Sequence, residues 1–119
     1  MVVGQYNITI VQGSDKDITM TLKEDNGDLI DLSTYSARMQ VRPTKTAQII
    51  YDDLSTDNDR IEIDTTDSKV ILKFPNTITS AYDFKTAFYD LELYVGTDPI
   101  IVKRLLEGTF NVNKEVTRQ

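Results

Sequence analysis

Apolar and polar residues alternate with a period of two along most of this chain, and this pattern constrains the fold more than any other feature. Successive side chains of a β-strand point to opposite faces, so alternation indicates strands with one buried face and one face in water. The run SARMQVR, residues 36–42, shows the pattern clearly. On the same grounds, the side chains expected in the core are Ile18, Met20, Leu22, Tyr35, Met39, Val41, Val70, Leu72, Tyr89, Leu91 and Leu93.

Turn-forming residues separate these runs. Asn26-Gly27 within EDNGD predicts a hairpin, because this pair tolerates positive φ at both central positions. Pro43 should end the strand before it, since proline cannot donate a hydrogen bond to a ladder. Residues Gly96–Pro99 should form the turn before the last strand.

One segment breaks the alternation. Residues 76–84, NTITSAYDF, follow a proline and predict a short helical turn near residues 77–84. Thr77 or Thr79 could cap this turn. Ile78, Ala81 and Tyr82 have the spacing to cover one end of a core.

The pattern therefore predicts about eight to ten short strands at fairly even spacing. The fold class expected is all-β, an antiparallel β-sandwich that is immunoglobulin-like in outline. A closed β-barrel is the alternative. No linker or repeat divides the chain, so we expect a single domain over residues 1–119.

Composition restricts the function. The net charge of -6 disfavours binding to nucleic acid or to anionic lipid, both of which require a basic surface. The chain has no Cys and no His, which excludes Cys nucleophiles, Ser-His triads and zinc sites of the usual kind. We therefore expect no catalytic residues, no cofactor and no metal site, and a protein made and folded in a cytoplasm.

Two acidic features are candidate sites. The segment DDLSTDNDRIEIDTTD, residues 52–67, is rich in carboxylates that calcium could use, but it lacks the order of an EF-hand loop and suits soluble turns equally well. Asp90 and Glu92 share one strand face. They are expected to be solvated or to form salt bridges with Arg38, Arg42 or Lys103, rather than to act as a glycosidase pair.

Two further features have structural explanations. GSDKD, residues 13–17, is expected to be a loop in which Ser14 or Asp15 bonds nearby backbone. The tyrosines on or beside the predicted strands are expected to pack rather than to bind a ligand. These are Tyr35, Tyr82, Tyr89 and Tyr94.

Six short motifs carry a resemblance to a known family. They are Gln12-Gly13, Asp31-Leu32, Tyr35–Arg42, Tyr89–Leu93, Arg104–Gly108 and Glu115–Arg118. With them the chain resembles, over nearly its whole length, a family of small bacteriophage virion proteins. More loosely, it is similar to the N-terminal β-sandwich of phage baseplate upper proteins, which attaches a receptor-binding appendage to the tail. The acidic stretch RIEIDTTDSKV departs from the pattern, where a shorter hairpin is expected.

The resemblance implies a non-enzymatic structural component of a bacteriophage particle, expected to be a tail or baseplate adaptor that connects the tail to fibre or receptor-binding proteins. The alternatives are a head or neck decoration protein and, from another class, a module that binds host carbohydrate or calcium. Partners are then other virion proteins, namely tail, baseplate or fibre subunits, or further copies of the chain in the particle. The expected location is the virion, with the host cytoplasm during assembly.

Contacts with partners are expected at strand edges and at the C-terminus. Edge strands carry unpaired backbone groups that another chain can extend. Phe110 and Val112 alternate like a last core strand, whereas the residues beyond them lack apolar pairs. The residues predicted to contact a neighbouring chain are Lys114, Glu115, Val116, Thr117 and Arg118.

Overall fold

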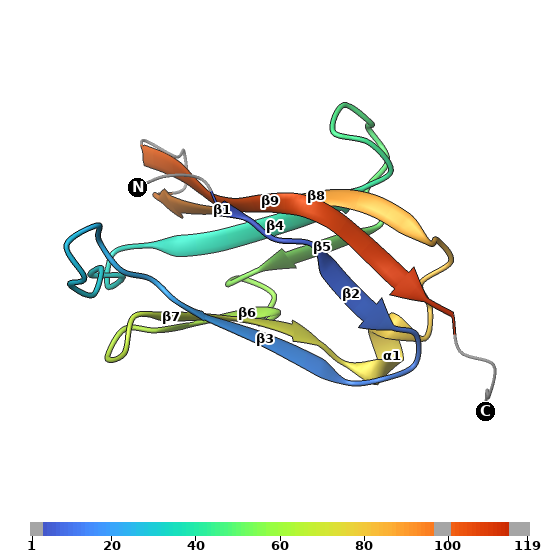
Figure 1. Ribbon diagram of the computed structural model, residues 1–119, viewed down its shortest axis with the longest axis horizontal. Coiled ribbons are helices and arrows are strands. Elements are labelled where there is room, and N and C mark those ends of the chain that lie inside the picture. Colours follow the sequence, from blue (N-terminus) through green and yellow to red (C-terminus); the bar gives the residue numbers. More distant parts are fainter. Residues whose placement is uncertain (1–3, 97–100, 115–119) are drawn as a thin grey trace.

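In the computed structural model, the described residues, 4–96 and 101–114, form nine strands and one short helix. The strands make two sheets that lie face to face (Figure 1). Each sheet has one apolar face, which is buried by packing against the other. The large sheet contains β1 (Gly4–Gln5), β2 (Ile8–Val11), β4 (Ser36–Arg42), β5 (Asp52–Ser55), β8 (Thr86–Val95) and β9 (Ile101–Asn113). The small sheet contains β3 (Lys16–Thr21), β6 (Ile61–Asp64) and β7 (Lys69–Phe74), and α1 (Asn76–Thr79) follows β7.

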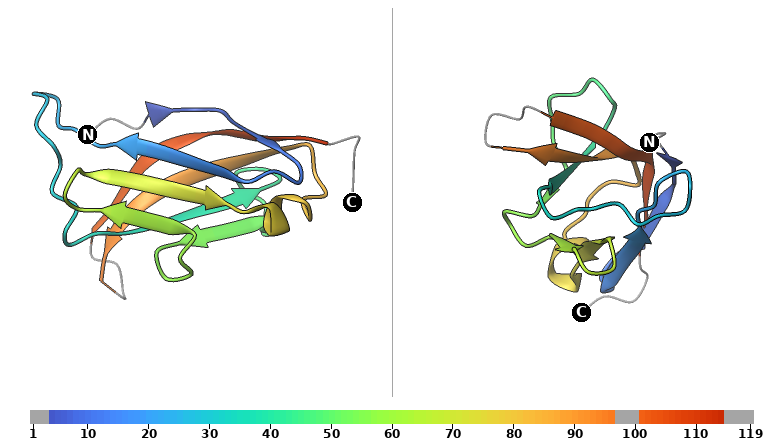
Figure 2. Two further views of the ribbon diagram at one scale, coloured as in Figure 1. Left: turned by 90° about the horizontal axis from the view of Figure 1, so that it is seen from below. Right: turned by 90° about the vertical axis from the view of Figure 1, so that its left-hand side faces the viewer.

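The prediction of an all-β sandwich is confirmed, and its strand order is that of an immunoglobulin-like domain. The large sheet has the order β1-β9-β8-β4-β5, with β2 also paired to β9, and the small sheet has the order β3-β7-β6. From β3 onward this matches the immunoglobulin strands B to G, with G-F-C-C′ in one sheet and B-E-D in the other. Figure 2 shows the sandwich from two further sides, with α1 at one end.

The expectation of purely antiparallel pairing is wrong for the first two strands. Both β1 and β2 pair parallel to β9, with Gly4 opposite Leu106 and Ile8 opposite Phe110. Strand alternation fixes which side chains face the core but carries no information on strand direction. The chain crosses from β2 to β3 in the other sheet, so β2 and β3 do not form a hairpin. Strand β2 pairs instead with the edge of β9, and β9 runs in the same direction as β2.

A close backbone approach links β1 and β2 along β9. Between the two strands, Tyr6 N donates to Glu107 O at 3.0 Å, and the Asn7 side chain accepts from Thr109 N at 3.1 Å. A Cβ atom on Gly108 would lie 2.2 Å from the Tyr6 carbonyl oxygen, far inside contact distance. The RLLEG motif therefore ends in glycine because the backbone between β1 and β2 lies against it at Tyr6.

We expect Gly108→Ala to lower the free energy of unfolding by about 1–3 kcal/mol, the range for overpacking a tight site. The added methyl group meets backbone atoms, which cannot rotate away as a side chain can. Thr86→Ala, at an exposed position on the neighbouring strand β8, is the control and should cost less than about 0.5 kcal/mol. Urea unfolding of both variants measures the difference, and equal small losses would show that the backbone at Tyr6 does not lie against Gly108.

The alternating side chains fill the space between the sheets. Ile8 and Ile10 from β2 meet Phe110 and Val112 from β9 in this core, and all four are buried. The strands β4, β7 and β8 alternate between buried and partly exposed residues over most of their length. Of the residues predicted for the core, those buried are Met39, Val41, Val70, Leu72, Tyr89, Leu91 and Leu93.

The other four predicted core residues pack against the core but remain partly exposed. Ile18 and Met20 lie on β3, Leu22 follows it, and Tyr35 precedes β4. The first three are less buried than predicted because β3 is the outer strand of the small sheet and has a neighbour on one side only. Tyr35 lies outside the sheet, just before the first residue of β4.

The predicted turns are found with differences in detail. Gly27 has φ +94, and Gly27 N donates to Glu24 O, but Asn26 is not among the residues with positive φ. The hairpin is thus a type I turn closed by glycine, rather than a turn with two left-handed residues. The strand before Pro43 ends at Arg42, as predicted. The turn predicted at Gly96–Pro99 falls mostly on residues 97–100, outside the described residues.

The helical turn is present but shorter than predicted, and the predicted caps are wrong. The residue before α1 is Pro75, whose side chain has no polar atom that could cap the helix. The Asp15 carboxylate accepts a hydrogen bond from Asn76 N at 2.7 Å instead. Thr79 is fully buried, and its hydroxyl donates to Ser14 O at 2.8 Å. Tyr82 covers the end of the core as expected, whereas Ala81 is exposed.

Candidate functional site

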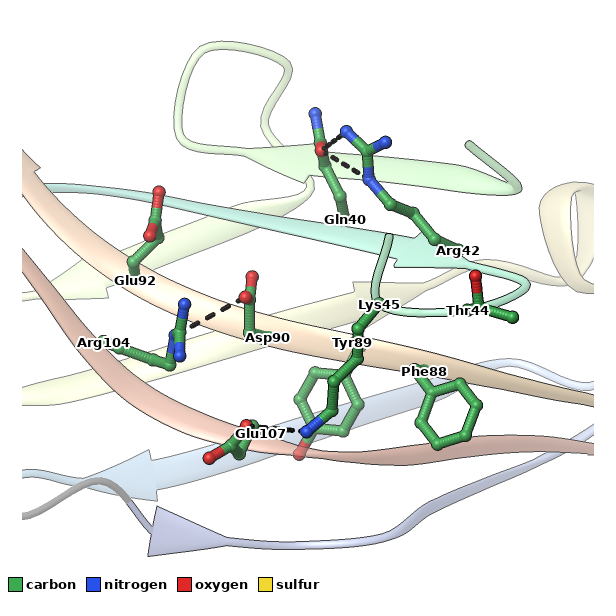
Figure 3. A pocket seen from close by; sticks show the side chains of 10 residues that line it. All are labelled: Gln40, Arg42, Thr44, Lys45, Phe88, Tyr89, Asp90, Glu92, Arg104 and Glu107. Carbon is green, nitrogen blue, oxygen red and sulfur yellow. Dashed lines mark hydrogen bonds and ion pairs between the residues drawn. The ribbon is translucent and has the colours of Figure 1, made fainter. Parts of the chain in front are cut away.

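The outer face of the large sheet carries a shallow hollow with a volume of about 360 Å³. Figure 3 shows its lining side chains, which come from β4, β8, β9 and the loop after β4. Most of the side chains are charged, and both signs are present. We refer to this surface as the charged face and define it by Arg38, Arg42, Asp90, Glu92, Arg104 and Glu107.

Strand alternation places the first four of these residues on one surface. On β4 and β8, the residues between the buried ones point outward, so Arg38 and Arg42 share a face with Asp90 and Glu92. The register sets Arg38 directly opposite Glu92 and Gln40 opposite Asp90. Opposite charges at paired positions stabilise such a sheet modestly.

A β-bulge brings the last two residues onto the same surface. Arg104 and Glu107 are three apart, so a regular strand would point them to opposite faces. The ladder between β8 and β9 pairs Leu91 with Leu106 but Glu92 with Arg104, which leaves Leu105 as the extra residue. Both charged side chains therefore line the hollow. Two adjacent leucines in RLLEG were the sequence signal for this bulge, and alternation alone missed it.

Ion pairs connect the charged face across its strands. Arg38 Nε lies 2.5 Å from Glu92 Oε1, and Arg104 Nε lies 3.5 Å from Asp90 Oδ2. Lys45, from the loop after β4, reaches Glu107 at 3.4 Å. The expected salt bridge between Glu92 and Arg38 is confirmed, whereas Asp90 pairs with Arg104 rather than with a residue of β4.

Asp90 lies at the centre of this network. Burial raises the pKa of its carboxyl group, the charge of Arg104 opposes that increase, and the negative charges of Glu92 and Glu107 add to it. Its side chain remains 42% exposed, so a partner can reach it. Asp90, Glu92 and Glu107 thus place three carboxylates on this surface, each paired with a cation of the same chain.

The charged face carries partly exposed charges of both signs. It offers cations and carboxylates within one surface, and its pairs are partly exposed, so they can exchange partners with a second charged surface. Among the described residues, no group of three or more acidic side chains could hold a metal ion.

A second network is buried at the side of the sandwich and was not foreseen. Arg60 Nη2 and Asp52 Oδ2 are 2.8 Å apart, with only 12% and 11% of the two side chains exposed. The Tyr82 hydroxyl also donates to Asp52, and Arg60 Nε donates to Lys73 O at 2.9 Å. These contacts connect β5, the segment before β6, β7 and the segment that follows α1. A buried tyrosine needs a partner for its hydroxyl, which was the available signal.

The predicted C-terminal contact residues are mostly outside the described part of the chain. Glu115, Val116, Thr117 and Arg118 lie beyond it. Lys114 is described, and its Nζ donates to the Tyr82 carbonyl oxygen at 2.9 Å. This contact lies within its own chain, and the contact of Lys114 with a neighbouring chain stays a prediction.

The acidic segment 52–67 is dispersed rather than gathered into a site. Asp52 belongs to the buried network, Asp64 accepts from the backbone of Thr66 and Asp67 in a turn, and Glu62 pairs with Lys73 at 3.0 Å. In the loop at residues 13–17, the Ser14 hydroxyl donates to Val11 O, as predicted for backbone bonding.

The tyrosines pack, as predicted. Tyr82 and Tyr89 are buried, and the Tyr89 hydroxyl donates to Tyr6 O at 2.6 Å. Tyr94 lies under the Arg38 guanidinium at 4.8 Å, and Tyr35 lies under the Lys103 ammonium at 5.5 Å. Tyr94 thus supports the charged face from beside it.

Comparison of the chain with models of known protein families and with curated proteins found no match. Within residues 4–96 and 101–114, no helix has the length and apolar character needed to span a membrane.

Proposed function

We propose that this chain is a non-enzymatic structural component of a bacteriophage particle, a tail or baseplate adaptor that binds its neighbour through the charged face. The proposal rests on the position of three motifs that carry the family resemblance. The motifs at Tyr35–Arg42, Tyr89–Leu93 and Arg104–Gly108 fall on β4, β8 and β9, which are adjacent strands of the large sheet.

The outward residues of these three motifs are the charged face itself. Arg38 and Arg42 come from the first motif, Asp90 and Glu92 from the second, and Arg104 and Glu107 from the third. The inward residues of the motifs account for the core, so packing explains them. A set of outward charges on one sheet is not needed for folding, because exposed ion pairs contribute little stability. Binding to another virion protein would explain why these three motifs carry charges on their outward face.

The test is incorporation into particles. Arg104→Glu reverses one charge at the centre of the charged face, and we expect it to reduce co-purification with the neighbouring virion protein about tenfold or more, as like charges placed across an interface do. Lys73→Glu makes the same charge change on the small sheet, where Lys73 is exposed, and is the matched control. Its co-purification should match that of the unaltered chain, and both variants should melt within a few degrees of it.

The experiment also separates the two predicted contact regions. A third variant lacks Glu115–Gln119 and keeps Lys114, because that lysine bonds to Tyr82 in its own chain. Loss of particles with this deletion but not with Arg104→Glu would move the interface from the charged face to the C-terminus. If the unaltered chain co-purifies with no tail, baseplate or fibre protein during phage growth, the proposed function is wrong.

A further inference from the structure

Strand β3 is an open edge of the small sheet. In the described part of the chain, β3 pairs with β7 on one side and with no strand on the other. Strand β3 corresponds to immunoglobulin strand B, and in a domain with the ABED sheet strand A would pair with this free side. Here the first strands, β1 and β2, both pair with β9 in the large sheet instead.

The backbone groups that face outward from this edge follow from the hydrogen bonds on its inner side. Leu22 N donates to Ser68 O, and Glu24 N donates to Asp28 O. The backbone groups of even-numbered residues therefore bond towards β7. The N–H and C=O groups of odd-numbered residues point away from β7, to the open edge, since the direction alternates along an antiparallel strand. The outward positions are Asp17, Thr19, Thr21 and Lys23.

The sequence along this edge is self-complementary about Met20. Residues 16–24 are KDITMTLKE. When two copies run antiparallel with Met20 opposite Met20, the outward-bonding residues of one copy lie opposite those of the other. The pairs across the two copies are then Lys16 with Glu24, Asp17 with Lys23, Ile18 with Leu22, and Thr19 with Thr21.

We propose that two copies of this chain pair through β3 about a two-fold axis at Met20, which extends the small sheet across the dimer. By symmetry each cross-strand pair occurs twice, so the dimer gains two pairs of Asp17 with Lys23 and two of Lys16 with Glu24. Within the described part of the chain, neither Asp17 nor Lys23 has an ion-pair partner of its own. The second copy supplies these partners.

A groove beside β3 adds an apolar contribution. It has a volume of about 490 Å³, and Ile18, Met20 and Leu22 line it from β3, with Gly4 and Leu106 on the opposite side. Figure 2 shows β3 at the margin of the sandwich near β1 and β2. The three apolar side chains are only partly buried in the single chain. A second copy would remove more of their surface from water, which favours association.

Charges on an edge strand can also serve to prevent pairing with other chains. That explanation requires charges that repel or remain unpaired when a second strand approaches. In the register described here, every charge from Lys16 to Glu24 instead meets its opposite. The inference does not depend on the proposed role in a phage particle, and it concerns the sheet opposite the charged face.

Charge reversal tests the register directly. At about 100 μM, where a dimer with a dissociation constant near 10 μM is mostly assembled, sedimentation should show a dimer of the unaltered chain. Asp17→Lys alone, or Lys23→Asp alone, should raise the dissociation constant about tenfold or more, because each places like charges opposite at two positions. Mixing the two single variants should restore a dimer, since each lysine then meets an aspartate of the other copy.

Matched controls exclude a general effect of net charge. Asp57→Lys and Lys85→Asp make the same changes at exposed positions away from β3 and should leave the dimer unchanged. A monomer of the unaltered chain at this concentration overturns the proposal. A dimer that survives both single reversals, or single variants that do not assemble when mixed, also overturns it.

Cross-linking gives a second measure that does not rely on charge. The chain has no cysteine, so Met20→Cys introduces a single thiol at the two-fold axis. Under oxidation it should form a covalent dimer, because directly opposite Cβ atoms lie within disulfide reach. Thr19→Cys is the control and should cross-link poorly, since Thr19 lies opposite Thr21. The reverse outcome would mean that the register is wrong.

Discussion

Asp52→Ala should lower the free energy of unfolding by about 3–5 kcal/mol, the range for removing one partner of a buried ion pair. The Arg60 guanidinium would lose a partner 2.8 Å away while remaining almost fully buried, and the Tyr82 hydroxyl would lose its acceptor. Asp53→Ala is the matched control, because Asp53 is the next residue and is exposed. Its cost in a urea melt should be below about 1 kcal/mol.

The stability that the Asp52 carboxylate contributes should depend on pH. Burial alone would raise the pKa of Asp52, but the hydrogen bonds from Arg60 and Tyr82 and the charge of Arg60 outweigh it, and the pKa is lowered. Its contribution to stability is therefore complete above the usual aspartate pKa of about 3.9 and is lost as the pH falls through the lower folded value. The stability difference between the unaltered chain and Asp52→Asn should shrink over that acidic range. A constant difference down to pH 2 would contradict the assignment.

Leu91→Ala should cost about 2–5 kcal/mol, as buried leucine truncations do. Leu91 has no exposed surface and lies on β8 between Met39 of β4 and Leu106 of β9. Its neighbour Glu92 points to the opposite face and pairs with Arg38, where both side chains are partly exposed. Glu92→Ala should therefore cost less than about 1 kcal/mol. If urea melts gave equal small losses for the two variants, the inward face of β8 would be misassigned.

The period of two was sufficient to identify the strands and most of the core. Met39, Val41, Leu91 and Leu93 alternate on strands that have neighbours on both sides, and all four are buried. The same period overestimated burial on β3, because alternation shows which face a side chain takes and not whether a neighbouring strand covers it. The position of a strand within its sheet depends on contacts distant in sequence.

The candidate site was predicted only in part for related reasons. Asp90 and Glu92 were recognised as sharing a face, since they are two apart on one strand. Their position beside Arg104 and Glu107 depends on a bulge, which shifts the alternation by one residue. The contact between Asp52, Arg60 and Tyr82 joins residues up to 30 positions apart in a geometry that no local pattern encodes.

The parallel pairing of β2 with β9 affects how the chain can fold during synthesis. Strand β2, Ile8–Val11, has its partner in β9, Ile101–Asn113, which is synthesised about 90 residues later. At ordinary translation rates roughly 5–20 s separate them. During that interval Ile8 and Ile10 have no ladder to join, and β8 lacks one of its two neighbours. The large sheet therefore cannot close until β9 has been synthesised, and a chaperone that holds β2 in the nascent chain would protect Ile8 and Ile10 during that interval.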